Sequence, residues 1–158
     1  MAIRHSPCRC LINICAEQCR QRNKRPWLSC CAKQATAGRL VGLRTNEPAK
    51  GKCFVPGGVV RKYERLTDAF ARIVKAEIGL KASIDDAKFV GVYEHLFDTN
   101  FSGEEEFGTH YVVLAHELNL DHQLSIVSDR QHSGFRWMAA TELISSPDVH
   151  HYTRAYFL

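Results

Sequence analysis

The segment of residues 66–78 carries one acidic side chain in the middle of an otherwise apolar helical face. Advancing by about 100° per residue from Leu66 brings Glu77 to about 20°, at the centre of the apolar stripe. The apolar members of that stripe are Leu66, Ala69, Phe70, Ile73, Val74 and Leu80. A carboxylate that is buried without a partner is costly, so either this end of the helix is exposed or Glu77 faces a bound metal ion.

A glycine pair, Gly57-Gly58, precedes this helix and lets the backbone approach a ligand closely. A main-chain carbonyl there could join Glu77 on a hard cation such as Mg2+, which takes oxygen ligands and suits phosphate-containing substrates. Most glycine pairs only form turns, and we expect a brief strand at residues 53–56 to enter a turn at this point.

The elements that must hold these residues follow from periodicity and from the positions of turn residues. We expect strands at residues 39–44, 53–56, 88–98, 109–120 and 135–138, and helices at 66–78, 139–146 and 149–158. Thr67 or a nearby polar residue is expected to cap the start of the first helix, and Gly79 its end. This order predicts an α+β fold, an α/β/α sandwich with a mixed β-sheet.

Length and composition indicate one globular domain. The chain has 158 residues, of which 45% are hydrophobic and 24% charged, and this is ordinary for a protein with a single core. No apolar run is long enough to cross a bilayer, and the first residues lack the apolar core of a signal peptide. We therefore expect a cytoplasmic protein that does not bind membranes.

The first 50 residues differ from the remainder in charge and in cysteine content. They hold 10 Lys/Arg and 2 Asp/Glu, a balance of +8, whereas residues 51–158 hold 11 and 15, a balance of −4. Six of the seven cysteines lie there: Cys8, Cys10, Cys15, Cys19, Cys30 and Cys31. Nucleic-acid binding is a minor alternative for this segment, because aromatic residues are not interleaved with its basic ones. A zinc site is equally minor, because the cysteines lack paired C-x2-C spacing. Disulfides are disfavoured in a reducing cytoplasm.

The region around the helix resembles the Nudix box, G-x5-E-x7-R-E-U-x-E-E-x-G-U, in which U is aliphatic. The matching residues are Gly58, Glu64, Arg72, Val74, Glu77, Gly79 and Leu80. Ile73 and Ala76 stand where the pattern has glutamates. Typical members use those carboxylates to bind several metal ions and to activate water at phosphorus, so their loss argues against that chemistry. The wider family also implies that Glu64 bonds Arg72 across the start of the helix.

The same two losses are typical of a divergent Nudix subfamily, the GDP-mannose mannosyl hydrolases. Segments that resemble this subfamily are found between residues 39 and 158, at 44–58, 91–103, 109–114, 129–137 and 154–158. The resemblance implies hydrolysis of GDP-mannose, and also of GDP-glucose, to GDP and the free sugar. Water would attack the anomeric carbon, and the configuration there would invert.

A metal site and a general base are implied by the same resemblance. One Mg2+ per subunit, with Mn2+ as an alternative ion, would be held by the Glu77 carboxylate, the Gly57 carbonyl and the Gln131 side chain. His132 would be the general base, because a histidine with a pKa near 6.5 can accept a proton at neutral pH.

Three further residues are implied to contact the substrate. Arg44 would bind the diphosphate and stabilise the charge that develops on it, so that it acts in catalysis together with Glu77 and His132. Tyr111 would lie near the diphosphate, and His95 would lie at the sugar. Members of the subfamily form homodimers.

Two departures from the subfamily keep other functions open. Val59 replaces an arginine that touches the diphosphate, and residues 26–34 lack the aspartate of the usual N-terminal strand. The alternatives are a conventional Nudix pyrophosphohydrolase of a nucleoside diphosphate derivative and a nucleotide-sugar-binding protein with impaired catalysis. We expect residues 39–158 to form the Nudix hydrolase domain. Residues 1–38 are expected to be an atypical basic, Cys-rich segment that comes from a frameshifted or misannotated reading frame.

Overall fold

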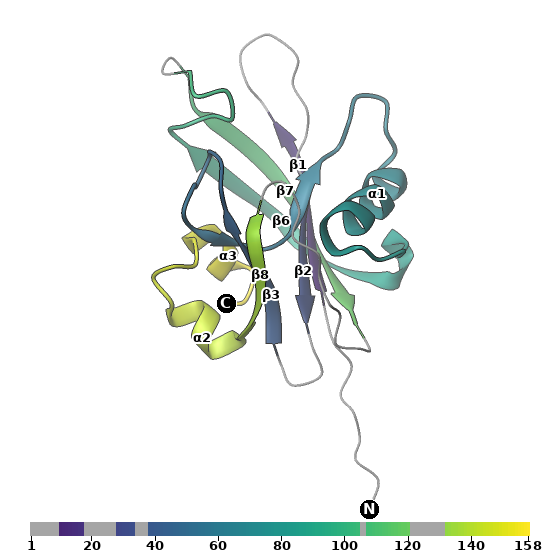
Figure 1. The fold of residues 1–158 in the computed structure, drawn as a ribbon. Coiled ribbons are helices and arrows are strands. Elements are labelled where there is room, and N and C mark those ends of the chain that lie inside the picture. Colours follow the sequence, from purple (N-terminus) through teal and green to yellow (C-terminus); the bar gives the residue numbers. More distant parts are fainter. Residues whose placement is uncertain (1–9, 18–27, 34–37, 105–106, 121–131) are drawn as a thin grey trace, which may run out of the picture.

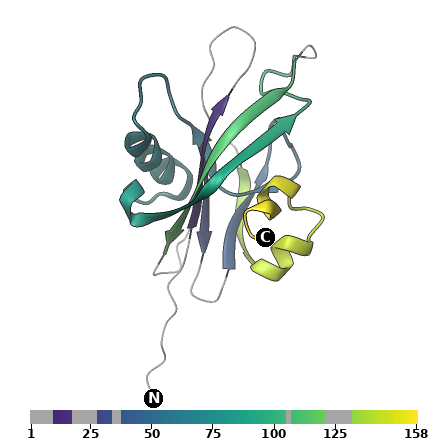
Figure 2. The same ribbon diagram turned by 180° about the vertical axis from the view of Figure 1, so that it is seen from behind.

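The computed structural model describes residues 10–17, 28–33, 38–104, 107–120 and 132–158, and for 10–17, 28–33 and 132–133 it describes the backbone. Its centre is a mixed β-sheet with helix α1 on one side and helices α2 and α3 on the other (Figures 1 and 2). This confirms the predicted α+β sandwich. Among the described residues, no helix combines the length and the hydropathy that crossing a bilayer requires.

The sheet contains eight strands in the described part of the chain, in the order β4-β3-β2-β5-β1-β7-β6, with β8 paired to β3. The strands are β1 Cys10–Glu17, β2 Leu28–Lys33, β3 Gly38–Arg44, β4 Cys53–Phe54, β5 Gly57–Val59, β6 Ala87–Phe97, β7 Thr109–Asn119 and β8 His132–Ala139. The helices are α1 Leu66–Ile78, the 3-10 helix η1 Ile84–Asp86, α2 Ala140–Ser145 and α3 His151–Ala155. The β1–β5 and β2–β7 pairs are parallel, whereas the other pairs are antiparallel.

Two apolar clusters cover the two faces of this sheet. Neighbouring residues of β3 point to opposite faces, so Leu40 packs with the buried face of α1 and Val41 packs with the layer that contains α2. The α1 cluster includes Phe70, Ile73 and Val74, which confirms the apolar stripe predicted for that helix.

Helix α1 has the bounds that its periodicity predicted, and one of its two predicted caps is correct. Gly79 adopts the left-handed conformation with φ 74°, and its N–H donates to the carbonyl of Lys75 at 3.1 Å. The cap predicted at Thr67 is wrong. The residue before the helix is Arg65, which is extended and makes no side-chain capping bond. The start of α1 is instead held by an ion pair described below.

The glycine pair is part of the sheet rather than a turn. Gly57, Gly58 and Val59 form β5, and Gly58 pairs in parallel with Ile14 of β1 and antiparallel with Leu28 of β2. Both β1 and β2 come from the segment before residue 39, in which the sequence shows no clear period. They take central positions in the sheet, so the backbone of β5 lies between them.

The left-handed cap at Gly79 leads to a stability prediction. A Cβ at this position would meet nothing within 4 Å, so Gly79→Ala costs conformational energy alone, about 1–2 kcal/mol. We expect the urea midpoint of Gly79→Ala to fall, and that of Gly79→Asn to fall less, because asparagine tolerates this conformation. Equal midpoints for the wild type and Gly79→Ala would contradict the assignment of Gly79 as the helix cap.

Candidate active site

Glu77 is buried on the inner face of α1, where its side chain is only 5% exposed. The possibility that this end of the helix is exposed is therefore wrong. Helix α1 packs against β5, the strand that carries Gly57, so a carboxylate and a row of main-chain oxygens belong to neighbouring elements. Ile73 is buried in the core and Ala76 is exposed, and neither can supply the carboxylate that a typical Nudix helix has there.

A charged clamp fixes the start of α1 to the end of β5. The Arg72 guanidinium donates to both carboxylate oxygens of Glu64, at 2.7 and 2.8 Å, and to the carbonyl of Val59 at 2.7 Å. The N–H of Arg61 also donates to Glu64 at 2.8 Å. The bond from Arg72 holds the pKa of Glu64 down at about 2. This confirms the predicted Glu64–Arg72 bond, and it sets the position of β5 relative to the helix that carries Glu77.

Arg44 ends β3 and is buried, with 5% exposure. Its guanidinium carbon lies 5.6 Å from the centre of the Phe54 ring, in a cation–π arrangement. Its main chain bonds to Lys52 and Gly51 at 3.0 and 2.9 Å, closing the loop between β3 and β4. In the sheet register, Arg44 pairs with His132 of β8, after an irregularity that begins at Gly42.

His95 lies on β6 and is 3% exposed. Its Nε2 is 2.7 Å from the hydroxyl of Tyr156, and its ring stacks on that of Tyr152 with centroids 4.3 Å apart. Burial lowers the pKa of His95 from its usual 6.5 to about 3. The neighbouring charges of His150, His151 and Arg44 act in the same direction. The ring is therefore neutral at physiological pH.

Aromatic contacts connect the three substrate-contact residues that the sequence predicted. The Phe54 ring lies 6.2 Å from that of His95, and it also carries Arg44 on its face. Tyr111 is the register partner of His95 on β7, is buried, and lies 6.0 Å from the Phe97 ring. The structure thus brings Arg44, His95 and Tyr111 into one cluster.

Sequence reasoning assigned no role to His150, which belongs to this cluster. Its ring lies 4.8 Å from that of Phe54, and its Nδ1 accepts the N–H of Tyr152 at 3.3 Å, which caps α3. Burial, together with the neighbouring charges of His151 and Lys52, lowers the pKa of His150 to about 4. The signal available in the sequence was the pair His150-His151 directly before a helical segment.

Two predicted site residues cannot be placed in full. Gln131 lies outside the described residues. His132 is described only as backbone in β8, next to Arg44 in the register. Within the described part of the chain, no group of three or more His, Cys, Asp or Glu side chains forms a metal site.

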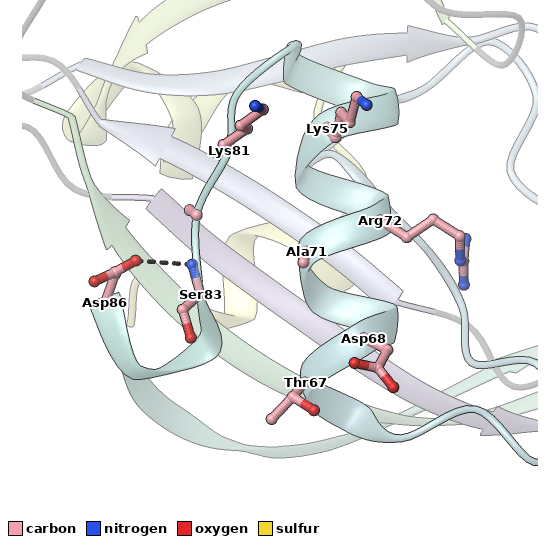
Figure 3. Close-up of a pocket in the computed structure, with 9 residues that line it drawn as sticks. Thr67, Asp68, Ala71, Arg72, Lys75, Lys81, Ser83 and Asp86 are labelled. Atoms are coloured by element: carbon pink, nitrogen blue, oxygen red, sulfur yellow. Dashed lines mark hydrogen bonds between the residues drawn. The ribbon is translucent and has the colours of Figure 1, made fainter.

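Two surface hollows lie outside the predicted site. One, of about 640 Å3, lies between the outer face of α1 and the segment around η1; Lys75 and Lys81 stand at one end, and Ser83 donates to Asp86 at 2.7 Å at the other (Figure 3). The other, of about 490 Å3, is lined by Leu43 and Gly51 beside Arg44. Neither is lined by a predicted site residue.

The buried neutral state of His95 makes stability dependent on pH. The unfolded chain binds a proton at this residue near pH 6.5, whereas the folded protein does so only near pH 3. The contribution of the neutral His95 ring to the free energy of unfolding is therefore complete above pH 6.5 and is lost as the pH falls towards 3. Between pH 6.5 and 4.5, we expect His95→Gln to reduce the slope of unfolding free energy against pH by up to about 1.4 kcal/mol per unit. Urea unfolding at several pH values measures this slope for the wild type and for His95→Gln. Equal slopes for the two proteins would contradict the prediction.

Comparison with known proteins identifies relatives of this chain. A family model described as the NUDIX domain matches residues 29–158. The low-salt glycan biosynthesis protein Agl8 of Haloferax volcanii is 43% identical over 96 residues, which make up 61% of this chain and 59% of that protein. This chain therefore spans less than two thirds of the length of that curated relative.

Two crystal structures share the fold. The MutT protein from Methanosarcina mazei aligns with a TM-score of 0.58 at 18% identity, over 77% of this chain and 81% of that one. The MutT NUDIX hydrolase from Burkholderia pseudomallei aligns with a TM-score of 0.55 at 26% identity, over 77% and 86%. The family match covers most of the chain and the fold agrees with it, so this chain belongs to the Nudix hydrolase family.

Proposed function

We propose that this chain hydrolyses GDP-mannose, and GDP-glucose as well, to GDP and the free sugar. The observation that carries the proposal is the single acidic side chain buried on α1. Glu77 is enclosed, whereas Ile73 and Ala76 occupy the positions at which typical Nudix hydrolases have further carboxylates. A helix with one buried carboxylate is suited to one metal ion and poorly suited to the several ions used for attack at phosphorus.

The metal site would consist of the Glu77 carboxylate, the Gly57 carbonyl and the Gln131 side chain, holding Mg2+ or Mn2+. The two donors in the described residues fit a hard cation, because the helix with the buried carboxylate packs against the strand that supplies main-chain oxygens. Bound Mg2+ would supply positive charge to stabilise the departing diphosphate. Nudix hydrolases generally use a divalent metal ion, and this agrees with the donor set.

The remaining roles are assigned to residues of the Arg44 cluster and its neighbour in β8. Arg44 would bind the diphosphate with Tyr111 beside it, and His95 would bind the sugar. The oxygen of water would attack the anomeric carbon from the face opposite the leaving group, and the C–O bond to the diphosphate would break with its electron pair. His132 would take the proton from that water. The register pairing of His132 with Arg44 supports this arrangement.

A nucleotide-sugar substrate agrees with the name of the 43% identical relative, which is a glycan biosynthesis protein. We further propose that the chain works as a homodimer in the cytoplasm. Phe89, Val92 and Leu96 are large apolar side chains that β6 leaves exposed, and β6 is the last strand on its side of the sheet. An exposed apolar row of this kind is suited to contact with another protein surface.

The position of bond cleavage distinguishes the proposal from its alternatives. GDP-mannose is incubated with the protein and Mg2+ in 18O-water, and the products are examined by mass spectrometry. Label in mannose is expected, label in phosphate would support a conventional pyrophosphohydrolase, and no turnover would support a binding protein.

Glu77→Gln should lower turnover by about 10²–10³-fold, the usual effect of removing one group that stabilises developing charge.

The matched control for Glu77→Gln is Asp68→Asn, which removes an acidic side chain from the exposed side of the same helix. Asp68→Asn should retain the wild-type rate. Full activity of Glu77→Gln would remove the metal site from the proposal.

His132→Gln tests the general base separately. We expect kcat to fall by about 10²–10⁴-fold, because the variant retains hydrogen bonding but cannot accept the proton. His110→Gln is the control, since His110 pairs with Glu94 on the partly exposed side of β7 at 3.1 Å. An unchanged kcat in His132→Gln would exclude His132 as the base.

A further inference from the structure

The C-terminal helix brings two tyrosines onto the histidine that the proposed function places at the sugar. Tyr156 meets Nε2 of His95 through its hydroxyl at 2.7 Å, and Tyr152 lies flat against the same ring, with an interplanar angle of 12°. The two tyrosines are four residues apart, about one helical turn, so they lie on the same side of this segment. The His95 ring is thereby held at one edge and on one face.

Helix α3 is itself anchored to the strand that carries His95. The Tyr152 hydroxyl accepts the N–H of Leu96 at 2.8 Å and donates to the carbonyl of Leu96 at 2.9 Å. Leu96 follows His95 on β6, the strand at the end of the sheet order, and the tyrosine satisfies backbone groups that an edge strand otherwise leaves unpaired. The tyrosines therefore fix the ring and its backbone together.

From this geometry we propose that Tyr156 is a positioning residue: its hydroxyl donates to Nε2 of His95, keeps the proton on Nδ1, and leaves the Nδ1–H to donate to an oxygen of the substrate sugar. The inference rests on the proposed function for the identity of the substrate. The separation of 2.7 Å is that of a hydrogen bond, and the tyrosine hydroxyl can donate it because a neutral imidazole accepts at one of its two nitrogens.

The surroundings of the ring favour a neutral histidine with one fixed tautomer. A neutral imidazole has one donor and one acceptor nitrogen, so occupying Nε2 as an acceptor determines the role of Nδ1. The ring is almost fully buried, and the charged or titratable groups that face it are Arg44, His150 and His151. All three oppose a second proton on His95. The site would consequently present a neutral donor to the sugar.

The tautomer can be measured without any substrate. Long-range 1H–15N correlation spectra of the ligand-free protein, with His95→Gln to assign the signals, report which ring nitrogen carries the proton. We expect Nδ1–H in the wild type and a mixture with Nε2–H in Tyr156→Phe. The control is Tyr93→Phe, because the Tyr93 ring packs on that of Tyr156 at 4.8 Å but does not contact His95 through a hydrogen bond in the described residues. This control should retain the wild-type spectrum.

Either of two spectral results would overturn the inference: an Nε2–H tautomer in the wild type, or an unchanged His95 spectrum in Tyr156→Phe. If circular dichroism shows that Tyr156→Phe does not fold, the tautomer of His95 in the wild type still tests the inference. An inactive wild-type protein would overturn the proposed function and leave this spectroscopic result intact, so the two failures are distinguishable.

Kinetics with GDP-mannose provide the second measurement. Loss of a bond that only positions a sugar-binding donor should raise KM about 3- to 10-fold while kcat changes by less. Tyr93→Phe should leave KM within about twofold of the wild type. A Tyr156→Phe variant with unchanged KM, or one in which kcat falls and KM stays constant, would contradict a positioning role in sugar binding.

Discussion

The bidentate ion pair between Arg72 and Glu64 is the interaction on which the geometry of the α1 side depends. It joins the first turns of α1 to the loop after β5, and a third bond reaches the carbonyl of Val59. Parallel guanidinium–carboxylate bonds define direction as well as distance, so β5 and α1 cannot slide past each other freely. The relative position of β5 and α1, which carry Gly57 and Glu77, follows from this constraint. Glu64 is acidic but serves this structural purpose.

The sheet separates two kinds of environment. On the α1 side, the notable group is one enclosed carboxylate in an apolar cluster. On the side of α2 and α3, aromatic rings surround neutral histidines, and Arg44 lies over one of those rings. Burial lowers the pKa of His95 and His150 by disfavouring their protonated form, so these histidines offer hydrogen bonds without adding to the positive charge of Arg44. Under the proposed function, the sugar would meet the neutral histidines and the diphosphate would meet Arg44, both on this side of the sheet.

The sequence predicted the features that depend on helical periodicity and on the conformational preferences of single residues. The bounds of α1 and the cap at Gly79 follow from a 3.6-residue period and from the conformational freedom of glycine. The same period put Glu77 on the apolar face but left open whether that end of the helix is exposed. The cap at Thr67 was wrong because Thr67 lies inside α1, and the Glu64–Arg72 ion pair holds the helix start. Strand β5 was missed because two glycines give no alternating pattern, and its strand character depends on neighbours from elsewhere in the chain. His150 and Tyr156 were missed for a similar reason, since Tyr156 reaches His95 across 61 positions of sequence.

The placement of α1 and α3 on opposite faces of one sheet has a consequence for how such a protein can change over generations. Glu77, which is proposed to hold the cation, lies on α1, whereas Tyr152 and Tyr156, which hold His95, lie on and directly after α3. The two helices pack in different apolar clusters. Substitutions in one cluster leave the packing of the other largely intact, because contacts between distant sites are nearly additive. Under the proposed function, selection for a new sugar would therefore act on α3 and β6 and leave the packing around Glu77 unchanged.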